Sequence, residues 1–212
     1  MAWEDRLECS DLIVRWGLCR DQGRWGELAD CFCPEALIHI SWFSGPALEF
    51  VAESRRTFDA SRERMILKHL IWPPSVEVVG DRAVAETSVA IVVRQKVDDF
   101  LMDNTSYARF HDRLERRDGK WRILERTGIY ELDRYDAVDS PDKFARYMSA
   151  NDFSAVPAAY RYIGSRLLQV GRQIMPDVYV DGSEATSKLY DAGRAWLAAG
   201  QGHRSASLRE RT

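Results

Sequence analysis

The chain has 212 residues, a formal net charge of −3, an apolar fraction of 45% and seven tryptophans. This length suits one domain with an appendage better than two ordinary domains, and the apolar content is sufficient for a packed core. The negative net charge argues against a nucleic-acid partner, because proteins that bind phosphate backbones usually carry a basic excess.

The first 62 residues are expected to form three helices and one strand. Apolar side chains at helical spacing, with breaks at Gly23 and Pro34, place them in the order helix, helix, strand, helix over residues 3–21, 24–31, 36–42 and 47–62. Ser44-Gly45-Pro46 is expected to turn the chain into the third helix.

The four cysteines, Cys9, Cys19, Cys31 and Cys33, all lie in this first part of the chain. Cys31-Phe-Cys33 has the wrong spacing for a zinc site or a redox pair. We therefore expect reduced, partly buried thiols.

Four long strands are expected to follow, over residues 66–79, 82–97, 104–117 and 120–132. Pro73-Pro74 interrupts the first of them as a bulge or an edge kink. Asp118-Gly119 lies within an alternating stretch from Tyr107 to Arg126, which is typical of a hairpin. The strand over 82–97 has one apolar and one polar face, so the sheet is half buried and must curve over something.

The character of the sequence changes after residue 132. A polar link over 136–142 precedes two expected helices, over 153–170 and 185–199, and the chain ends in a polar segment. Residues 133–200 cannot bury their own aromatic side chains alone. We therefore divide the chain into a first domain (1–132), a helical extension (133–200) that wraps this domain or a partner subunit, and a flexible tail (201–212).

No run of 18 apolar residues occurs, so we expect no membrane span. The first residues, Met-Ala-Trp-Glu-Asp-Arg, are charged with both signs and lack the apolar core of a signal peptide. These two features favour a cytoplasmic protein.

The order of elements resembles the nuclear-transport-factor-2-like superfamily, and more narrowly its SnoaL-like cyclases, dehydratases and dehydrochlorinases. The resemblance covers about residues 5–132 and rests on His69 and on three segments, Arg20-Asp21-Gln-Gly-Arg-Trp25, Asp30-Cys-Phe-Cys-Pro-Glu-Ala36 and Asp112-Arg-Leu-Glu-Arg-Arg-Asp-Gly-Lys-Trp-Arg-Ile123. It implies an α+β fold in which N-terminal helices roof a cone-shaped, curved, mixed or antiparallel sheet. It also implies a homodimer, because the open sheet of this fold normally packs against a second copy.

The resemblance assigns catalytic roles to Asp21 and His69. In eliminating and hydrolytic members of the family, an Asp at the end of the first helix holds a pocket His that removes a proton, and these two residues fall on those positions. Taken alone, His69 also fits a core histidine, and Asp21 a helix-end residue paired with Arg24. We interpret His69 as a base whose tautomer Asp21 fixes. Arg20 is either a surface charge or an inward donor to a phenolate or alkoxide.

Six further residues are candidates for substrate binding. His39 lies in an Ile-His-Ile strand and could face the pocket, and Tyr107 and Arg109 share a strand face with His111. That face either converges on a ligand or forms cross-strand pairs outside the pocket. The aromatic residues are each typical of a core, but their number favours a flat aromatic ligand. The complete set is His39, Trp16, Trp42, Tyr107, Arg109 and Phe110.

Other chemistries lack their motifs in this sequence. There is no Gly-rich phosphate loop, no Walker sequence and no Gly-x-Ser-x-Gly elbow. Four histidines without paired ligand spacing argue against a catalytic metal. We expect neither a metal nor an organic cofactor.

The sequence therefore predicts a cofactor-independent lyase that acts on a hydrophobic aromatic substrate. One reaction is dehydration. The other, which the resemblance implies through relatives acting on lignin-derived diarylpropane diols, releases a terminal hydroxymethyl group as formaldehyde and gives a stilbene. The alternatives are a ketosteroid-isomerase-like proton shuttle, for which no carboxylate base is obvious, and a non-catalytic module that binds a small molecule.

Overall fold

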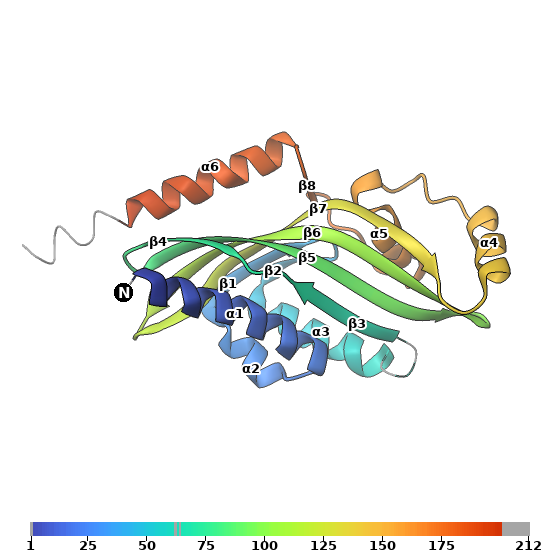
Figure 1. Ribbon diagram of the computed structural model, residues 1–212, viewed down its shortest axis with the longest axis horizontal. Helices are drawn as coiled ribbons and strands as arrows, with labels where there is room; N and C mark the ends of the chain where they lie inside the picture. Colours follow the sequence, from blue (N-terminus) through green and yellow to red (C-terminus); the bar gives the residue numbers. More distant parts are fainter. Residues whose placement is uncertain (1, 62, 64, 201–212) are drawn as a thin grey trace, which may run out of the picture.

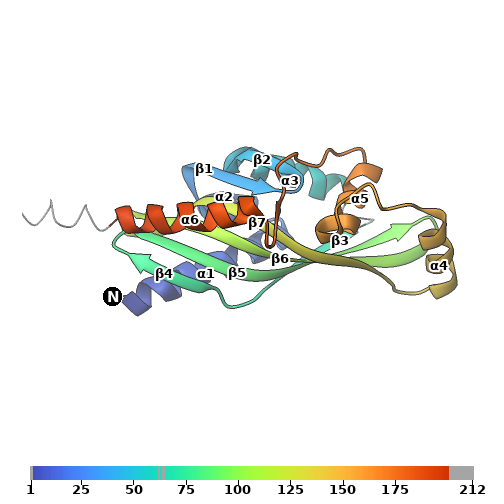
Figure 2. The ribbon, with the colours of Figure 1, turned by 90° about the horizontal axis from the view of Figure 1, so that it is seen from above.

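The computed structural model describes residues 2–61, 63 and 65–200, and in these residues an eight-stranded sheet runs the length of the molecule with helices on both faces (Figures 1 and 2). The helices are α1 (Ala2–Gln22), α2 (Trp25–Asp30), α3 (Ala47–Ser61), α4 (Pro141–Ala150), α5 (Arg161–Gln169) and α6 (Glu184–Ala199), with a 3-10 turn η1 (Ala158–Tyr160). The strands are β1 (Phe32–Ile40), β2 (Phe43–Pro46), β3 (Met65–Ile71), β4 (Ser75–Val79), β5 (Arg82–Val97), β6 (Phe100–Arg117), β7 (Lys120–Ala137) and β8 (Tyr179–Val180).

The sheet is mixed, which confirms the expected α+β class. Its strands follow the order β2-β1-β7-β6-β5-β3, with β4 added to β5 and β8 to β7. The pairs β1–β7 and β7–β8 are parallel, and the other pairs are antiparallel. The long antiparallel strands β5, β6 and β7 form its centre.

Local sequence explains the hairpin between β6 and β7. Asp118 and Gly119 have φ angles of 52° and 74°, which is the left-handed conformation that a two-residue hairpin turn requires. On β5, Ala83, Ala85 and Val89 are buried on the face that the alternation predicted. The expected hairpin around Asp118-Gly119 is therefore confirmed.

Three N-terminal helices cover one face of the sheet (Figure 1). The buried side of α1 consists of apolar residues at helical spacing, Cys9, Leu12, Ile13, Trp16 and Cys19. Helix α1 lies very close to β3 at Gly17, where a Cβ atom would clash with Cδ1 of Ile71. Asp21 lies one helical turn after Gly17, so this close approach brings its short side chain within reach of β3.

Several expected elements differ from those observed. The strand expected over 66–79 is two strands, because Pro73 and Pro74 offer no N–H groups to the ladder and pairing resumes only at Ser75. Strand β1 begins at Phe32, before Pro34, with a register shift between Phe32 and Leu37. Strand β2 takes the place of the expected turn at 44–46.

The C-terminal half contains further differences. Strand β7 continues past residue 132 to Ala137, and α4 begins at Pro141 within the expected polar link. The helix expected over 153–170 begins only at Arg161, because Pro157 disfavours helix in the residue before it. The flexible tail expected over 201–212 lies outside the described residues.

The C-terminal segment contacts the sheet at two places. Oδ2 of Asp133 on β7 accepts the backbone N–H groups of Tyr162 and Ile163, at 2.7 Å each, and so holds the beginning of α5. Further along, the backbone N–H of Met175 donates to the carbonyl of Ser41 at 2.8 Å. Residues 161–175 therefore run from β7 to the turn between β1 and β2.

Helix α6 packs against the opposite face of the sheet (Figures 1 and 2). The hydroxyl of Tyr190 donates to Oε1 of Glu86 at 2.6 Å, and Nη1 of Arg82 donates to the carbonyl of Trp196 at 2.9 Å. A Cβ atom at Gly193 would lie 2.8 Å from the ring of His111 on β6, so α6 lies directly on this strand. No helix in the described part of the chain is long and apolar enough to cross a membrane.

Replacing Asp133 by Ala is expected to loosen α5. The variant loses the carboxylate oxygen that accepts both N–H groups at the helix N-terminus, and the unpaired N–H groups cost about 1–3 kcal/mol. Hydrogen exchange of residues 161–169 should rise while β5 and β6 stay protected. Asp152→Ala, which removes an exposed carboxylate bonded to Ser154, is the matched control. Unchanged exchange of α5 in the Asp133 variant would contradict this role.

Candidate active site

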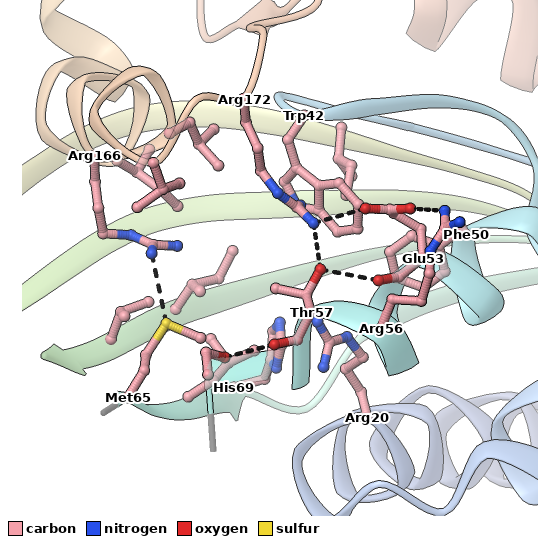
Figure 3. Close-up of a pocket in the computed structure, with 18 of the residues that line it drawn as sticks. Arg20, Trp42, Phe50, Glu53, Arg56, Thr57, Met65, His69, Arg166 and Arg172 are labelled. Atoms are coloured by element: carbon pink, nitrogen blue, oxygen red, sulfur yellow. Dashed lines mark hydrogen bonds and ion pairs between the residues drawn. The ribbon is translucent and has the colours of Figure 1, made fainter. Parts of the chain in front are cut away.

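A cavity of about 680 Å³ lies between the concave face of the sheet, α1, α3 and the segment 161–172. This volume is in the range of small-molecule sites. Figure 3 shows the side chains of Arg20, His69, Arg166 and Arg172 around this space, from helices, strands and the C-terminal segment.

Asp21 and His69 form a buried pair at the wall of the cavity. Oδ1 of Asp21 lies 2.6 Å from Nδ1 of His69, and Oδ2 accepts the backbone N–H of the same histidine at 2.8 Å. The side chains are 5% and 8% exposed, respectively. Because the Asp21 carboxylate accepts a hydrogen bond from the Nδ1–H group, the free lone pair of the imidazole is on Nε2. This arrangement suits a base with a fixed tautomer.

The electrostatic surroundings of His69 favour its neutral form. Burial lowers its pKa from the ordinary value of 6.5, and Arg20 and Arg126 lower it further, whereas the hydrogen bond and charge of Asp21 act in the opposite direction. A neutral imidazole is the form that can accept a proton. Asp21 can then stabilise the imidazolium that forms.

Arg126 lies in the centre of the sheet beneath the cavity. Its Nε and Nη2 donate to the two carboxylate oxygens of Asp112 at 2.7 Å each, and both side chains are almost fully buried, with exposures of 1% and 0%. The guanidinium carbon lies 4.1 Å from the ring centroid of Trp16 and 4.3 Å from that of Phe110. Its buried Nη1 has no hydrogen-bond partner among the described residues.

Arg20 points inward and lines the cavity. Burial lowers the pKa of its guanidinium to about 10, so it stays charged at neutral pH. Its Nη1 is buried and has no hydrogen-bond partner in the described part of the chain. Two guanidinium groups, those of Arg20 and Arg126, each with an unpartnered N–H group among the described residues, therefore lie near the imidazole of His69.

Aromatic side chains make up much of the remaining wall. Trp16 stacks on Phe50, with ring centroids 6.3 Å apart, and meets Phe110 edge to face at 5.4 Å. Trp42 packs against Phe50 at 5.5 Å. The phenol of Tyr130 donates to Oγ of Ser41 at 2.8 Å, and burial raises its pKa. The wall is thus flat and apolar, with a small number of polar groups.

Not all of the predicted site residues meet here. His69, Arg20, Trp16, Trp42 and Phe110 line the cavity, and Asp21 stands behind His69.

The other three predicted site residues lie elsewhere, because strand alternation places them on the opposite face of the sheet. His39, between the lining residues Ile38 and Ile40, bonds to Ser44 at 2.8 Å. Tyr107 and Arg109 alternate with the inward-facing Phe110, and Arg109 forms ion pairs with Glu86, Glu131 and Asp181. His111 lies on that face too, under α6.

Sequence reasoning missed several cavity residues: Glu53, Arg126, Tyr130, Arg166 and Arg172. Asp112 and Arg126 lie on either side of the Asp118-Gly119 turn, but an ideal two-residue hairpin places Asp112 opposite Glu125, so the sequence alone did not indicate their pairing. Arg166 and Arg172 had no local signal, because they reach the cavity from the C-terminal extension. Among residues 2–61, 63 and 65–200, no group of three or more His, Cys, Asp or Glu side chains is placed to hold a metal ion.

Comparison with known proteins gives a family for the chain and solved structures with a similar fold. The family model described as the SnoaL-like domain matches residues 1–127, whereas no curated protein matches the chain significantly in sequence. A provisionally assigned scytalone dehydratase from Novosphingobium aromaticivorans is similar in structure, with a TM-score of 0.53, 14% identity, and coverage of 65% of this chain and 91% of the other. A hexachlorocyclohexane dehydrochlorinase, LinA type 2, has a TM-score of 0.54, 18% identity, and coverage of 66% and 96%. At these identities the likeness concerns the fold.

Replacing Asp112 by Ala is expected to destabilise the protein by about 3–5 kcal/mol, because Arg126 is left charged and unpaired in the core. Urea unfolding measures the change. The matched control is Asp136→Ala, which breaks the exposed pair with Arg134 on the same hairpin and should cost less than about 1 kcal/mol. Equal losses of unfolding free energy in the two variants would show that the buried Asp112–Arg126 pair stabilises the protein no more than the exposed pair does.

Proposed function

The chain belongs to the SnoaL-like family, and we propose that it is a lyase that acts on a hydrophobic aromatic substrate without a cofactor. The observation that carries this proposal is the Asp21–His69 pair, a neutral imidazole held at 2.6 Å by a buried carboxylate at the wall of an aromatic cavity. Such a pair is suited to remove a proton at neutral pH.

In the proposed reaction, Nε2 of His69 takes a proton from the substrate, and Asp21 stabilises the resulting imidazolium. The free N–H groups of Arg126 and Arg20 stabilise negative charge on a departing oxygen. Arg126 is held rigidly by Asp112, so its donor is already in place before the reaction begins. The similar structures include proteins named for the elimination of water and of hydrogen chloride, which supports this class of reaction.

Within this class we favour deformylation of a 1,2-diarylpropane-1,3-diol. His69 removes the proton of the terminal hydroxyl, the bond between the terminal carbon and its neighbour breaks, and its electron pair forms the new double bond. The benzylic hydroxyl leaves as water, taking up a proton in place of the one that His69 removed, so that no net proton is gained or lost. The products are a stilbene, formaldehyde and water. A cavity of about 680 Å³ with aromatic walls supports a substrate with two rings.

Dehydration remains the closest alternative, because the same base can remove a C–H proton while the same guanidinium groups assist the hydroxyl. An isomerase of the ketosteroid type is less well supported. It uses a carboxylate base, and the one carboxylate among the described cavity-lining residues, Glu53, is paired with Arg56 and Arg172. A binding module without catalysis requires no proton transfer by His69.

We also propose that the protein is a cytoplasmic homodimer. The four cysteines are free and buried, which supports a reducing compartment. Helix α6 already covers part of the outer face of the sheet, so a second copy would contact the part of that face that α6 leaves open.

The test uses purified protein, treated with a chelator and given no cofactor, with a 1,2-diarylpropane-1,3-diol as substrate. Stilbene absorbance and formaldehyde are followed together. Equal amounts of both products are expected. His69→Ala and Asp21→Asn should lower the rate by roughly 10²–10⁴-fold, because each removes or misorients the base. His39→Ala, which changes a histidine outside the cavity, is the matched control and should keep the activity.

The outcomes separate the alternatives. A variant lacking His69 that keeps the full rate contradicts its role as the base. If the diol binds but yields neither product, deformylation is wrong. A screen of aromatic alcohols and enolisable ketones then distinguishes dehydratase, isomerase and binding module.

A further inference from the structure

A second polar region lies at the end of the cavity away from the Asp21–His69 pair, and the C-terminal extension supplies it. Arg166 of α5 and Arg172 just beyond it both line the cavity. Figure 3 shows Arg166 above Met65, at a distance from His69, with Arg172 beside Trp42. Both arginines lie outside the part of the chain that matches the family.

Arg166 is poorly satisfied by the protein. Its Nη1 lies 3.5 Å from Sδ of Met65, and a thioether is a weak acceptor. Its Nε is buried without a hydrogen-bond partner among the described residues. No carboxylate among the described residues forms an ion pair with Arg166, and burial lowers the pKa of its guanidinium. A desolvated cation without an anion is costly, so this position favours a ligand that brings one.

The cavity as a whole has more cations than anions. Its lining residues include six cationic side chains and one carboxylate among the described residues: Arg20, Arg56, Lys96, Arg126, Arg166 and Arg172 against Glu53. Arg172 donates to Glu53 at 2.8 Å, and Arg56 pairs with the same carboxylate. Asp112 neutralises Arg126 from below. The positive charge of Arg166 is therefore not cancelled locally.

The separation of the two regions indicates an elongated ligand. Met65, which contacts Arg166, and His69 lie on the same face of β3, four residues apart. At a rise of about 3.3 Å per residue, their Cα atoms are about 13 Å apart. A molecule with two aromatic rings can span this distance.

We propose that the substrate carries a carboxylate at the end remote from the reacting carbon, and that Arg166 binds it with assistance from Arg172. This inference rests on the proposed function, because it places the reacting end at His69. A guanidinium presents paired N–H donors that match a carboxylate, so the site selects an aromatic acid over a neutral molecule of the same shape. The extension thus sets specificity, whereas the family domain supplies the base.

The test is an equilibrium binding measurement with two probes of nearly equal shape, trans-stilbene-4-carboxylate and trans-stilbene-4-carboxamide. The full chain is titrated at low salt, with quenching of tryptophan fluorescence or calorimetry as the readout. The wild type should bind the carboxylate at least about tenfold more tightly than the amide, the gain typical of a charge-assisted pair. In Arg166→Met the preference should fall below about twofold, with binding of the amide unchanged. Arg166→Lys should keep part of the preference.

Arg146→Met is the matched control, because it removes an exposed arginine of α4 outside the cavity. It should bind both probes as the wild type does. Equal binding of the two probes by the wild type, binding of neither, or a preference that survives in Arg166→Met would overturn the inference. The binding measurement does not depend on turnover. A lyase assay without product and the absence of a preference for the carboxylate are therefore separate results.

Discussion

The site depends on one carboxylate that joins a helix to a strand. Asp21 accepts both the backbone N–H and the ring N–H of His69, so it fixes the position of the imidazole as well as its tautomer. This contact requires α1 to lie very close to β3, which the missing Cβ of Gly17 permits. If α1 lay farther from β3, a Glu would be needed to reach His69, and its extra rotatable bond would hold the imidazole ring less rigidly.

The rest of the fold supports this pair from two directions. Below it, the Asp112–Arg126 pair holds a guanidinium against Trp16 and Phe110 and leaves one N–H without an acceptor among the described residues. Around the cavity opening, residues 161–172 complete the wall, and Asp133 on β7 holds the beginning of that segment. The Asp21–His69 and Asp112–Arg126 pairs thus come from the part of the chain that matches the family, and residues 161–172 of the wall come from beyond it.

Sequence patterns predicted the long helices, the central strands and the hairpin, because these depend on local alternation and on turn residues. They did not predict which face His39 occupies, since Ile-His-Ile is apolar on both sides and its flanking isoleucines are the ones that line the cavity. They also missed the pairing of Asp112 with Arg126. A register shift between Arg113 and Leu114 aligns these two residues, and an ideal hairpin would have placed Asp112 opposite Glu125. The contribution of Arg166 is a tertiary contact without a local signature.

The most direct test of the central claim is the state of the His69 ring, observed through its nitrogen resonances by NMR. The chain has four histidines, so His69→Ala identifies the signal. The account predicts a neutral ring protonated on Nδ1 at pH 7, with a titration midpoint below 6.5 because burial lowers the pKa. It also predicts loss of this tautomer preference in Asp21→Asn. A doubly protonated ring at pH 7, or a proton on Nε2 instead of Nδ1, would contradict His69 as the base.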